Sequence, residues 1–247
     1  MSTPTLSVIT GHWERHNEIA RLTRWVAERT PPVDYEFLIA DCSEVPFDPA
    51  SVGEAGTHAR IVRDWPKSTC SLAYERMVRE ARGEFVLWLN DDAEPFPNYA
   101  ENALKFMRAN PTVGLGALYW CHSTPPFFVD QWPAGVPYAN FGIFRKELAV
   151  RWEHPFDADL VPMYGLDNAL SLKVWLAGLG VVGIPDARVI NHRIHDAQRQ
   201  HNETNYVGAG GNAATHKLMM RYGERMDEVR ANVAKFAHMQ GPKEIRA

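Results

Sequence analysis

Hydrophobic positions in the first 120 residues predict strands that alternate with helices. Short apolar, β-branched runs typical of strands recur, and between them apolar side chains return every three or four positions, as on one face of a helix. We expect strands at residues 6–10, 37–40, 59–62, 85–89 and 115–120, and helices around residues 19–26, 73–81 and 99–107. Residues 44–58, rich in Pro, Gly and Ser, are expected to form a loop. This alternation is typical of a mostly parallel sheet with helices on both sides.

The second half is less regular. Residues 122–141 predict a long surface segment, residues 167–177 a helix, residues 181–184 a strand, and residues 197–212 a mobile loop. The last helix carries apolar residues at spacings of four and three, at Tyr222, Met226, Val229, Val233 and Phe236. We expect this stripe to dock on the body of the protein or on a second copy, which would make a homodimer. No linker divides the 247 residues, which favours a single domain.

Composition limits the class of protein. With 45% hydrophobic and 23% charged residues the chain is typical of a globular protein, and its net charge of −4 argues against an extended nucleic-acid partner or an anionic lipid surface. The three cysteines are widely separated, which favours a reducing compartment. No apolar run approaches the ~18 residues of a membrane helix, and the N-terminus lacks the apolar h-region typical of a signal peptide. We therefore expect a cytoplasmic protein with no transmembrane segment.

Polar residues follow three predicted strands at the point where each ends: Gly11-His12-Trp13-Glu14, Asp41-Cys42-Ser43 and Asn90-Asp91-Asp92. Ligands of open α/β sheets bind outside the carboxyl ends of the strands. Adjacent carboxylates after a fully apolar strand suit a divalent cation such as Mn²⁺ or Mg²⁺, which joins carboxylates to phosphate oxygens. The alternative is an acidic turn that caps the next helix.

The stretch Glu80-Ala81-Arg82-Gly83-Glu84-Phe85-Val86-Leu87-Trp88-Leu89-Asn90-Asp91-Asp92 resembles a segment of the family 2 glycosyltransferases of the GT-A fold. Further blocks resemble that family in the same order, at residues 7–10, 39–43, 156–160, 166–173 and 180–192, so that the resemblance covers about residues 5–195. It implies a GT-A-like, Rossmann-like, mostly parallel central sheet flanked by helices, with a C-terminal helical extension. It also implies a nucleotide-sugar-binding half at residues 5–120 and an acceptor and catalytic half at 121–200, with the loop and last helix at 201–247.

The resemblance assigns roles in donor binding. Asp92 matches the ligand of the nucleotide-bound Mn²⁺ or Mg²⁺, and His192 matches a second metal ligand, with His195 a weaker candidate. The remaining donor positions are Asn90 and Asp91 beside the ribose and phosphates, Asp41 at the base, and Gly11, His12 and Glu14 on the first nucleotide loop. A carboxylate at Asp41 suits the imide of uracil, so a UDP-sugar is the favoured donor.

Asp167 falls at the family's catalytic base. An inverting transfer needs a carboxylate that takes the proton of the acceptor hydroxyl as its oxygen attacks the anomeric carbon. The alternative is an acid placed at a helix N-terminus by the macrodipole. The chain departs from the family at Asn90, at Leu166, and at Tyr74, where the family has an arginine that contacts the diphosphate.

These departures favour one rival, a catalytically impaired nucleotide-sugar-binding protein of the same fold. A GT-A-like nucleotidyltransferase is a second rival, although a Gly-rich, basic loop after the first strand is missing. Saccharides, lipid-linked sugars, proteins, small metabolites and modified nucleobases all stay open as acceptors. The aromatic residues at 127–132 would either stack on an acceptor or cover the core.

Overall fold

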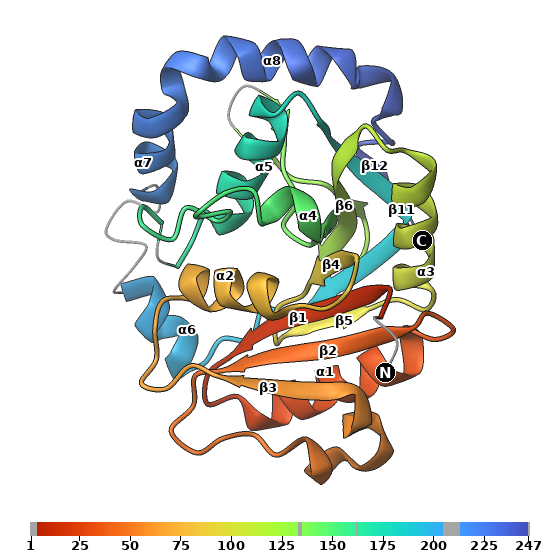
Figure 1. Cartoon of the computed structure of the whole chain (residues 1–247), viewed down its shortest axis with the longest axis vertical. Coiled ribbons are helices and arrows are strands. Elements are labelled where there is room, and N and C mark those ends of the chain that lie inside the picture. The colour runs from red at the N-terminus through yellow and green to blue at the C-terminus, as the bar shows by residue number, and fades with distance from the viewer. Residues whose placement is uncertain (1–3, 133–134, 162, 205–212, 247) are drawn as a thin grey trace.

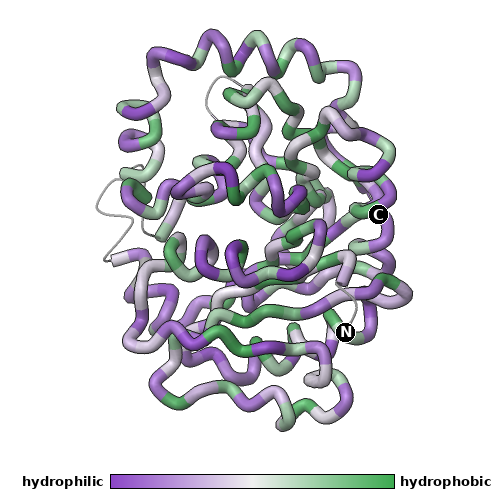
Figure 2. The backbone as a smooth tube through the Cα atoms, viewed as in Figure 1, coloured by the Kyte–Doolittle hydropathy of each residue, from purple (hydrophilic) through white to green (hydrophobic). Residues whose placement is uncertain are grey.

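The computed structural model describes residues 4–132, 135–161, 163–204 and 213–246 and has a mixed α/β architecture (Figure 1). Four parallel strands form its N-terminal half, in the order β3-β2-β1-β4. They are β1 (Leu6–His12), β2 (Tyr35–Asp41), β3 (Ala59–Arg63) and β4 (Phe85–Trp88). All four were predicted from their apolar runs, and every residue of β4 is buried. Hydrophobic stretches concentrate along these central strands (Figure 2).

Helices cover both faces of the parallel strands. Helix α1 (His16–Arg29) buries Ile19, Leu22 and Val26, the residues whose spacing predicted it. Helix α2 (Cys70–Glu80) packs on β1 and β2. Right-handed crossovers in opposite directions along the sheet place α1 and α2 on opposite faces. Residues 44–58, which were expected to form a loop, contain the 3₁₀ helix η1 (Pro49–His58). The side chain of Asp48 caps the start of this helix by accepting from the backbone N–H of Ala50 at 2.9 Å.

The predicted mostly parallel sheet flanked by helices is confirmed, and its second half adds shorter antiparallel pairings. Strand β10 (Gly142–Arg145), which the sequence did not predict, lies antiparallel between β4 and β6 (Val113–His122). A Cβ at Gly142 would lie 2.6 Å from the ring of Trp88, so glycine allows this close pairing. Strand β11 (Gly180–Asn191) runs parallel to β6 and also pairs with β5 (Ala93–Pro95), while α3 (Tyr99–Ala109) packs on β11.

Within the predicted surface segment 122–141, residues 122–126 are exposed, whereas most of the later described residues are partly or fully buried. They contain β7 (Phe127–Phe128), β8 (Gln131–Trp132) and β9 (Val136–Pro137), and β7 joins the sheet between β6 and β12 (Glu244–Ile245). The side chains of Phe127, Trp132 and Phe141 are buried. The burial of Phe127 and Trp132 favours the alternative that the aromatic residues at 127–132 cover the core.

The C-terminal region packs against its own chain. The predicted last helix is two helices, α7 (Ala213–Tyr222) and α8 (Met226–Lys235), joined by the 3₁₀ turn η3 (Gly223–Arg225) and followed by the 3₁₀ turn η4 (Ala237–Met239). Helix α8 packs on α5 (Leu166–Leu176) (Figure 1). The ring of Phe236 lies 6.0 Å from that of Trp175. The apolar stripe is thus buried within one chain and gives no support for a dimer.

Two short helices complete the second half, α4 (Lys146–Ala149) and α6 (Ala197–Asn202). Helix α6 occupies the first part of the segment expected as a mobile loop, and residues 205–212 of that segment lie outside the described residues. Among the described residues, no helix is long and apolar enough to cross a membrane.

Candidate active site

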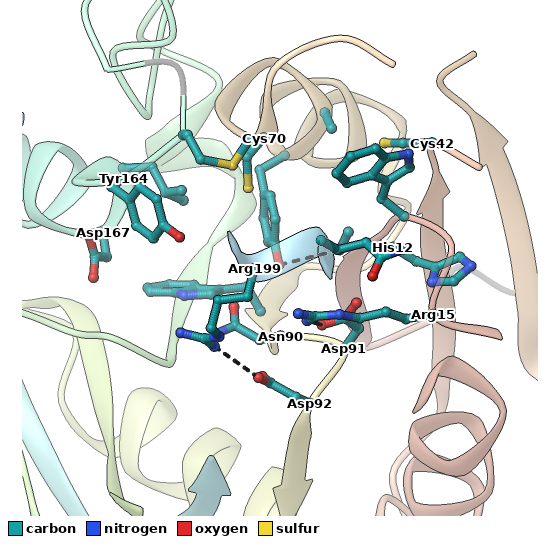
Figure 3. Close-up of a pocket in the computed structure, with 18 of the residues that line it drawn as sticks. His12, Arg15, Cys42, Cys70, Asn90, Asp91, Asp92, Tyr164, Asp167 and Arg199 are labelled. Atoms are coloured by element: carbon teal, nitrogen blue, oxygen red, sulfur yellow. Dashed lines mark hydrogen bonds and ion pairs between the residues drawn. The ribbon is translucent and has the colours of Figure 1, made fainter. Parts of the chain in front are cut away.

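A cleft of about 330 Å³ opens at the carboxyl ends of β1 and β4. Its walls come from the loop after β1, from α2, from the turn after β4, from the start of α5 and from α6, segments far apart in the sequence. Figure 3 shows Arg15 and Arg199 on the side of the strand-end acids, with Tyr164 and Asp167 across the cleft. The ionisable groups that line it are Arg15, Lys67, Asp91, Asp92, Asp167 and Arg199, together with His12, Cys42, Cys70, Tyr74 and Tyr164.

The acidic turn after β4 forms the floor of this cleft, as the sequence predicted. Asn90, Asp91 and Asp92 all line it. Asp91 accepts a hydrogen bond from Arg15 Nη1 at 3.0 Å, and burial beside the Asp92 carboxylate raises the pKa of Asp91 to about 7 although Arg15 opposes the shift. The Asp92 carboxylate is 2% exposed; its Oδ2 lies 3.2 Å from Arg199 Nη2 and accepts a long hydrogen bond of 3.4 Å from Ile194 N–H. Each acid is therefore held by one arginine.

The turn fits a divalent cation that is shared with a ligand. Among the described residues, no group of three or more His, Cys, Asp and Glu side chains is arranged to hold a metal ion by itself. Mg²⁺ usually takes one or two carboxylates and completes its shell with water and substrate phosphates, and the adjacent Asp91 and Asp92 provide that smaller donor set.

His192 does not join Asp92 through its side chain, contrary to the sequence prediction. Its backbone N–H donates to the carbonyl of Asp92 at 3.0 Å, but its imidazole Nε2 lies 2.9 Å from Glu94 Oε2 and the ring stacks on Trp25 at 5.7 Å. His192 is not among the residues that line the cleft, and His195 is exposed. The structure therefore places neither imidazole among the groups that line the cleft.

The carboxyl end of β1 places Gly11 and His12 in the cleft wall. His12 is buried, its Nε2 lies 3.1 Å from the hydroxyl of Ser43, and burial lowers its pKa to about 4, so the imidazole is neutral at pH 7. The Tyr74 hydroxyl accepts from Gly11 N–H at 3.3 Å and donates to the carbonyl of Leu89 at 2.8 Å. Tyr74 thus links the ends of β1 and β4.

Asp41 and Glu14 hold loops together and do not line the cleft. Asp41 is buried, and its two carboxylate oxygens accept from Ser43 N–H at 2.8 Å and from Phe47 N–H at 2.6 Å. Glu14 accepts from Glu44 N–H at 2.7 Å. The nucleotide-binding roles that the resemblance assigned to these two residues find no support in their contacts.

Asp167 faces the cleft from the first turn of α5. Gly165 precedes the helix with φ +89°, and a Cβ there would lie 2.8 Å from the Cβ of Ala214, so glycine is required for this approach. Asp167 Oδ1 accepts from the backbone N–H of Asn168 at 2.9 Å and from its side-chain amide at 3.2 Å. Burial raises the pKa of Asp167 to about 6, which leaves the carboxylate charged and more basic than usual at pH 7.

Sequence reasoning missed the cations of the site. Arg15, Lys67 and Arg199 line the cleft, and the ammonium of Lys67 lies 3.4 Å from the centre of the Trp13 ring. Arg15 stands three residues beyond β1, where the strand-end rule could have found it. Arg199 carries no such local signal, because it reaches Asp92 across 107 positions of the sequence.

Comparison with known proteins identifies the class. A family model described as glycosyl transferase family 2 matches residues 7–161, so the chain belongs to this family and is a glycosyltransferase. A search of the curated proteins gives no match.

Solved structures of similar fold agree with this class. A mannosyltransferase from Pyrobaculum calidifontis, solved with GDP-Man and Mn²⁺, is 18% identical with a TM-score of 0.59, over 98% of this chain and 77% of that one. Glucosyl-3-phosphoglycerate synthase from Mycobacterium tuberculosis, solved with Mn²⁺, UDP and glucosyl-3-phosphoglycerate, is 15% identical with a TM-score of 0.61, over 89% of this chain and 80% of that one. Mannosyl-3-phosphoglycerate synthase from Rubrobacter xylanophilus is 16% identical with a TM-score of 0.60, over 91% and 75%. At these identities the likeness concerns the fold.

Proposed function

We propose that the protein transfers a sugar from a nucleotide diphosphate donor, with a UDP-sugar as the leading candidate, to an acceptor hydroxyl, with inversion at the anomeric carbon. The observation that carries the proposal is that the strand-end acids Asp91 and Asp92 and the partly buried Asp167 line one cleft. The acidic turn is suited to the diphosphate end of a donor, and Asp167 to the acceptor.

Asp167 acts as the general base in this proposal. Inverting displacement needs a carboxylate on the side of the attacking hydroxyl, in its charged form and basic enough to take the proton. A pKa of about 6 meets both needs at neutral pH. The two hydrogen bonds from Asn168 fix Oδ1, which orients the carboxylate at the start of α5.

Asp92, with Asp91 beside it, would hold a Mn²⁺ or Mg²⁺ ion. When bound, such an ion stabilises the negative charge that grows on the departing diphosphate. Arg15 and Arg199 place two guanidinium groups at the same acids, where they are suited to bind phosphate oxygens.

The donor base is best tested directly, because Asp41, which favoured uracil in the sequence, bonds to its own loop. Thermal shifts are measured with UDP-, GDP- and other nucleotide sugars, each with Mn²⁺, Mg²⁺ or EDTA. A true donor raises the Tm by mass action, and raises it further in the presence of the ion. No shift with any nucleotide sugar would refute the proposal.

Turnover separates an active enzyme from the impaired binding protein that Asn90, Leu166 and Tyr74 favour. Release of the nucleoside diphosphate is followed with candidate acceptors for the wild type, for Asp167→Asn and for the exposed control Asp186→Asn. We expect Asp167→Asn to bind the donor normally and to lose at least about 100-fold in kcat, since general base catalysis contributes about 10²–10⁴-fold. Donor binding without release by the wild type would support the impaired protein.

A further inference from the structure

The segment of residues 193–203, here called the α6 segment, follows β11 and lines the cleft with Gln198 and Arg199. Two ion pairs tie it to the loop after β1 and to the acidic turn after β4. Asp196 accepts from Arg15 Nε at 2.7 Å and Nη2 at 2.8 Å, and Arg199 Nη2 lies 3.2 Å from Asp92 Oδ2. The Nε of Arg199 also donates to the carbonyl of Ile194 at 2.8 Å, which holds the guanidinium within the segment.

Arg199 therefore pairs with the Asp92 carboxylate, the group that the proposed function assigns to the divalent cation. Asp92 is 2% exposed and Arg199 20%, so this pair is largely shielded from water and is not an ordinary surface contact. A divalent cation on Asp92 would compete with the guanidinium, because two positive groups at one carboxylate repel each other. The negative charge of a bound diphosphate is enough to hold both the cation and the Arg199 guanidinium in the site.

We infer that Arg199 is an exchangeable binding residue, which holds Asp92 in the free protein and moves to the diphosphate when the nucleotide and the cation bind. The inference rests on the proposed function. Its consequence is that cation and nucleotide bind interdependently: the nucleotide draws Arg199 away from Asp92 and so strengthens cation binding, and by linkage the cation strengthens nucleotide binding by the same factor.

The test measures binding and needs no acceptor. The affinity for Mn²⁺ alone is measured by the electron paramagnetic resonance signal of free Mn²⁺, and the affinities for UDP and GDP by calorimetry in EDTA and at saturating Mn²⁺. For the wild type we expect weak binding of Mn²⁺ alone and an affinity about tenfold higher with the nucleotide bound.

The variant Arg199→Gln separates the two roles of the side chain. It should bind Mn²⁺ alone about threefold or more tighter than the wild type, because a competitor for Asp92 is gone. It should bind the nucleotide in EDTA about tenfold more weakly, because a charged hydrogen bond to phosphate is lost. The tenfold coupling should fall, leaving the part that comes from direct contact between the cation and the diphosphate.

Matched variants control for damage to the segment. Gln200→Ala, an exposed change in the same helix, should reproduce wild-type binding, and Asp92→Asn combined with Arg199→Gln should abolish the gain in Mn²⁺ affinity. If Arg199→Gln does not fold, Arg199→Lys replaces it, with the same signs and smaller effects.

Each result decides the inference. Opposite effects on Mn²⁺ and nucleotide support it. Weaker binding of both, as from collapse of a structural contact, overturns it, and so does unchanged binding of Mn²⁺. Failure of the wild type to bind any nucleotide diphosphate overturns the proposed function and the inference with it, whereas nucleotide binding without coupling overturns the inference alone.

Discussion

Replacing Asp167 by asparagine should stabilise the protein at neutral pH while it removes the proposed base. Burial raises the pKa of Asp167 from 3.8 to about 6 in the folded state, so the folded protein binds this proton more tightly than the unfolded chain. The stability that the carboxylic acid form supplies is therefore lost as the pH rises from about 4 through about 6. Asparagine carries no charge, and its side-chain oxygen can still accept from the Asn168 N–H.

The size of the effect follows from linkage. A shift of about two pKa units, at 1.36 kcal/mol for each unit, makes the ionised Asp167 cost at most about 3 kcal/mol above pH 7. For a chain of this length, 1 kcal/mol changes the Tm by about 2–4 °C. We expect the variant to melt about 3–10 °C higher than the wild type at pH 7.5, and the difference to shrink to about 1 °C at pH 4.

Differential scanning calorimetry of both proteins between pH 4 and pH 8 checks this prediction. The exposed Asp186→Asn serves as the control and should leave the Tm within about 2 °C at every pH, since exposed substitutions change stability by about 0.5 kcal/mol or less. An Asp167→Asn variant that melts at or below the wild-type temperature at pH 7.5, or a gain that does not vary with pH, would refute the argument from burial.

Four further outcomes are expected. If Asp167 is the base, kcat/KM should rise with pH and level off above an apparent pKa near 6, and a limb near 4 in the pH–rate profile would contradict the raised value. Tyr74→Phe removes the bridge between Gly11 and Leu89 and should lower the free energy of unfolding in urea by about 1–2 kcal/mol. Asp157→Ala leaves the charges of Lys173 and Arg221 without their buried partner and should lower the free energy of unfolding by about 3–5 kcal/mol in the same assay. A decrease of less than about 1 kcal/mol would show that water takes the place of the carboxylate. Phe236→Ala, at the contact of α8 with Trp175, should cost about 3–5 kcal/mol by thermal melting, and no change would mean that α8 is dispensable to the fold.

Local sequence patterns were sufficient to predict those features of the fold that depend only on residues close together in the chain. The apolar run of β4 and the helical spacing of Ile19, Leu22 and Val26 predicted elements that the structure contains, because the periods of strands and helices are properties of short segments. The acids of the turn after β4 and Asp167 also lie in one cleft, as the strand-end rule and the family resemblance implied. Strand β10 escaped prediction because Gly142–Arg145 has no pattern of its own and is fixed by β4 and β6 on either side.

The sequence by itself thus determined the order of most strands and helices, the family, and the acids at the strand ends. The tertiary structure alone decided which charges meet: Arg15 reaches Asp196 across 181 positions, a distance over which no sequence period acts. It also decided where His192 points. Strand β11 has an irregular register between Ile184 and Arg188, and each single-residue shift turns a side chain to the other face of a strand. Counting along the sequence could therefore place His192 at the end of the strand but could not tell that its imidazole contacts Glu94.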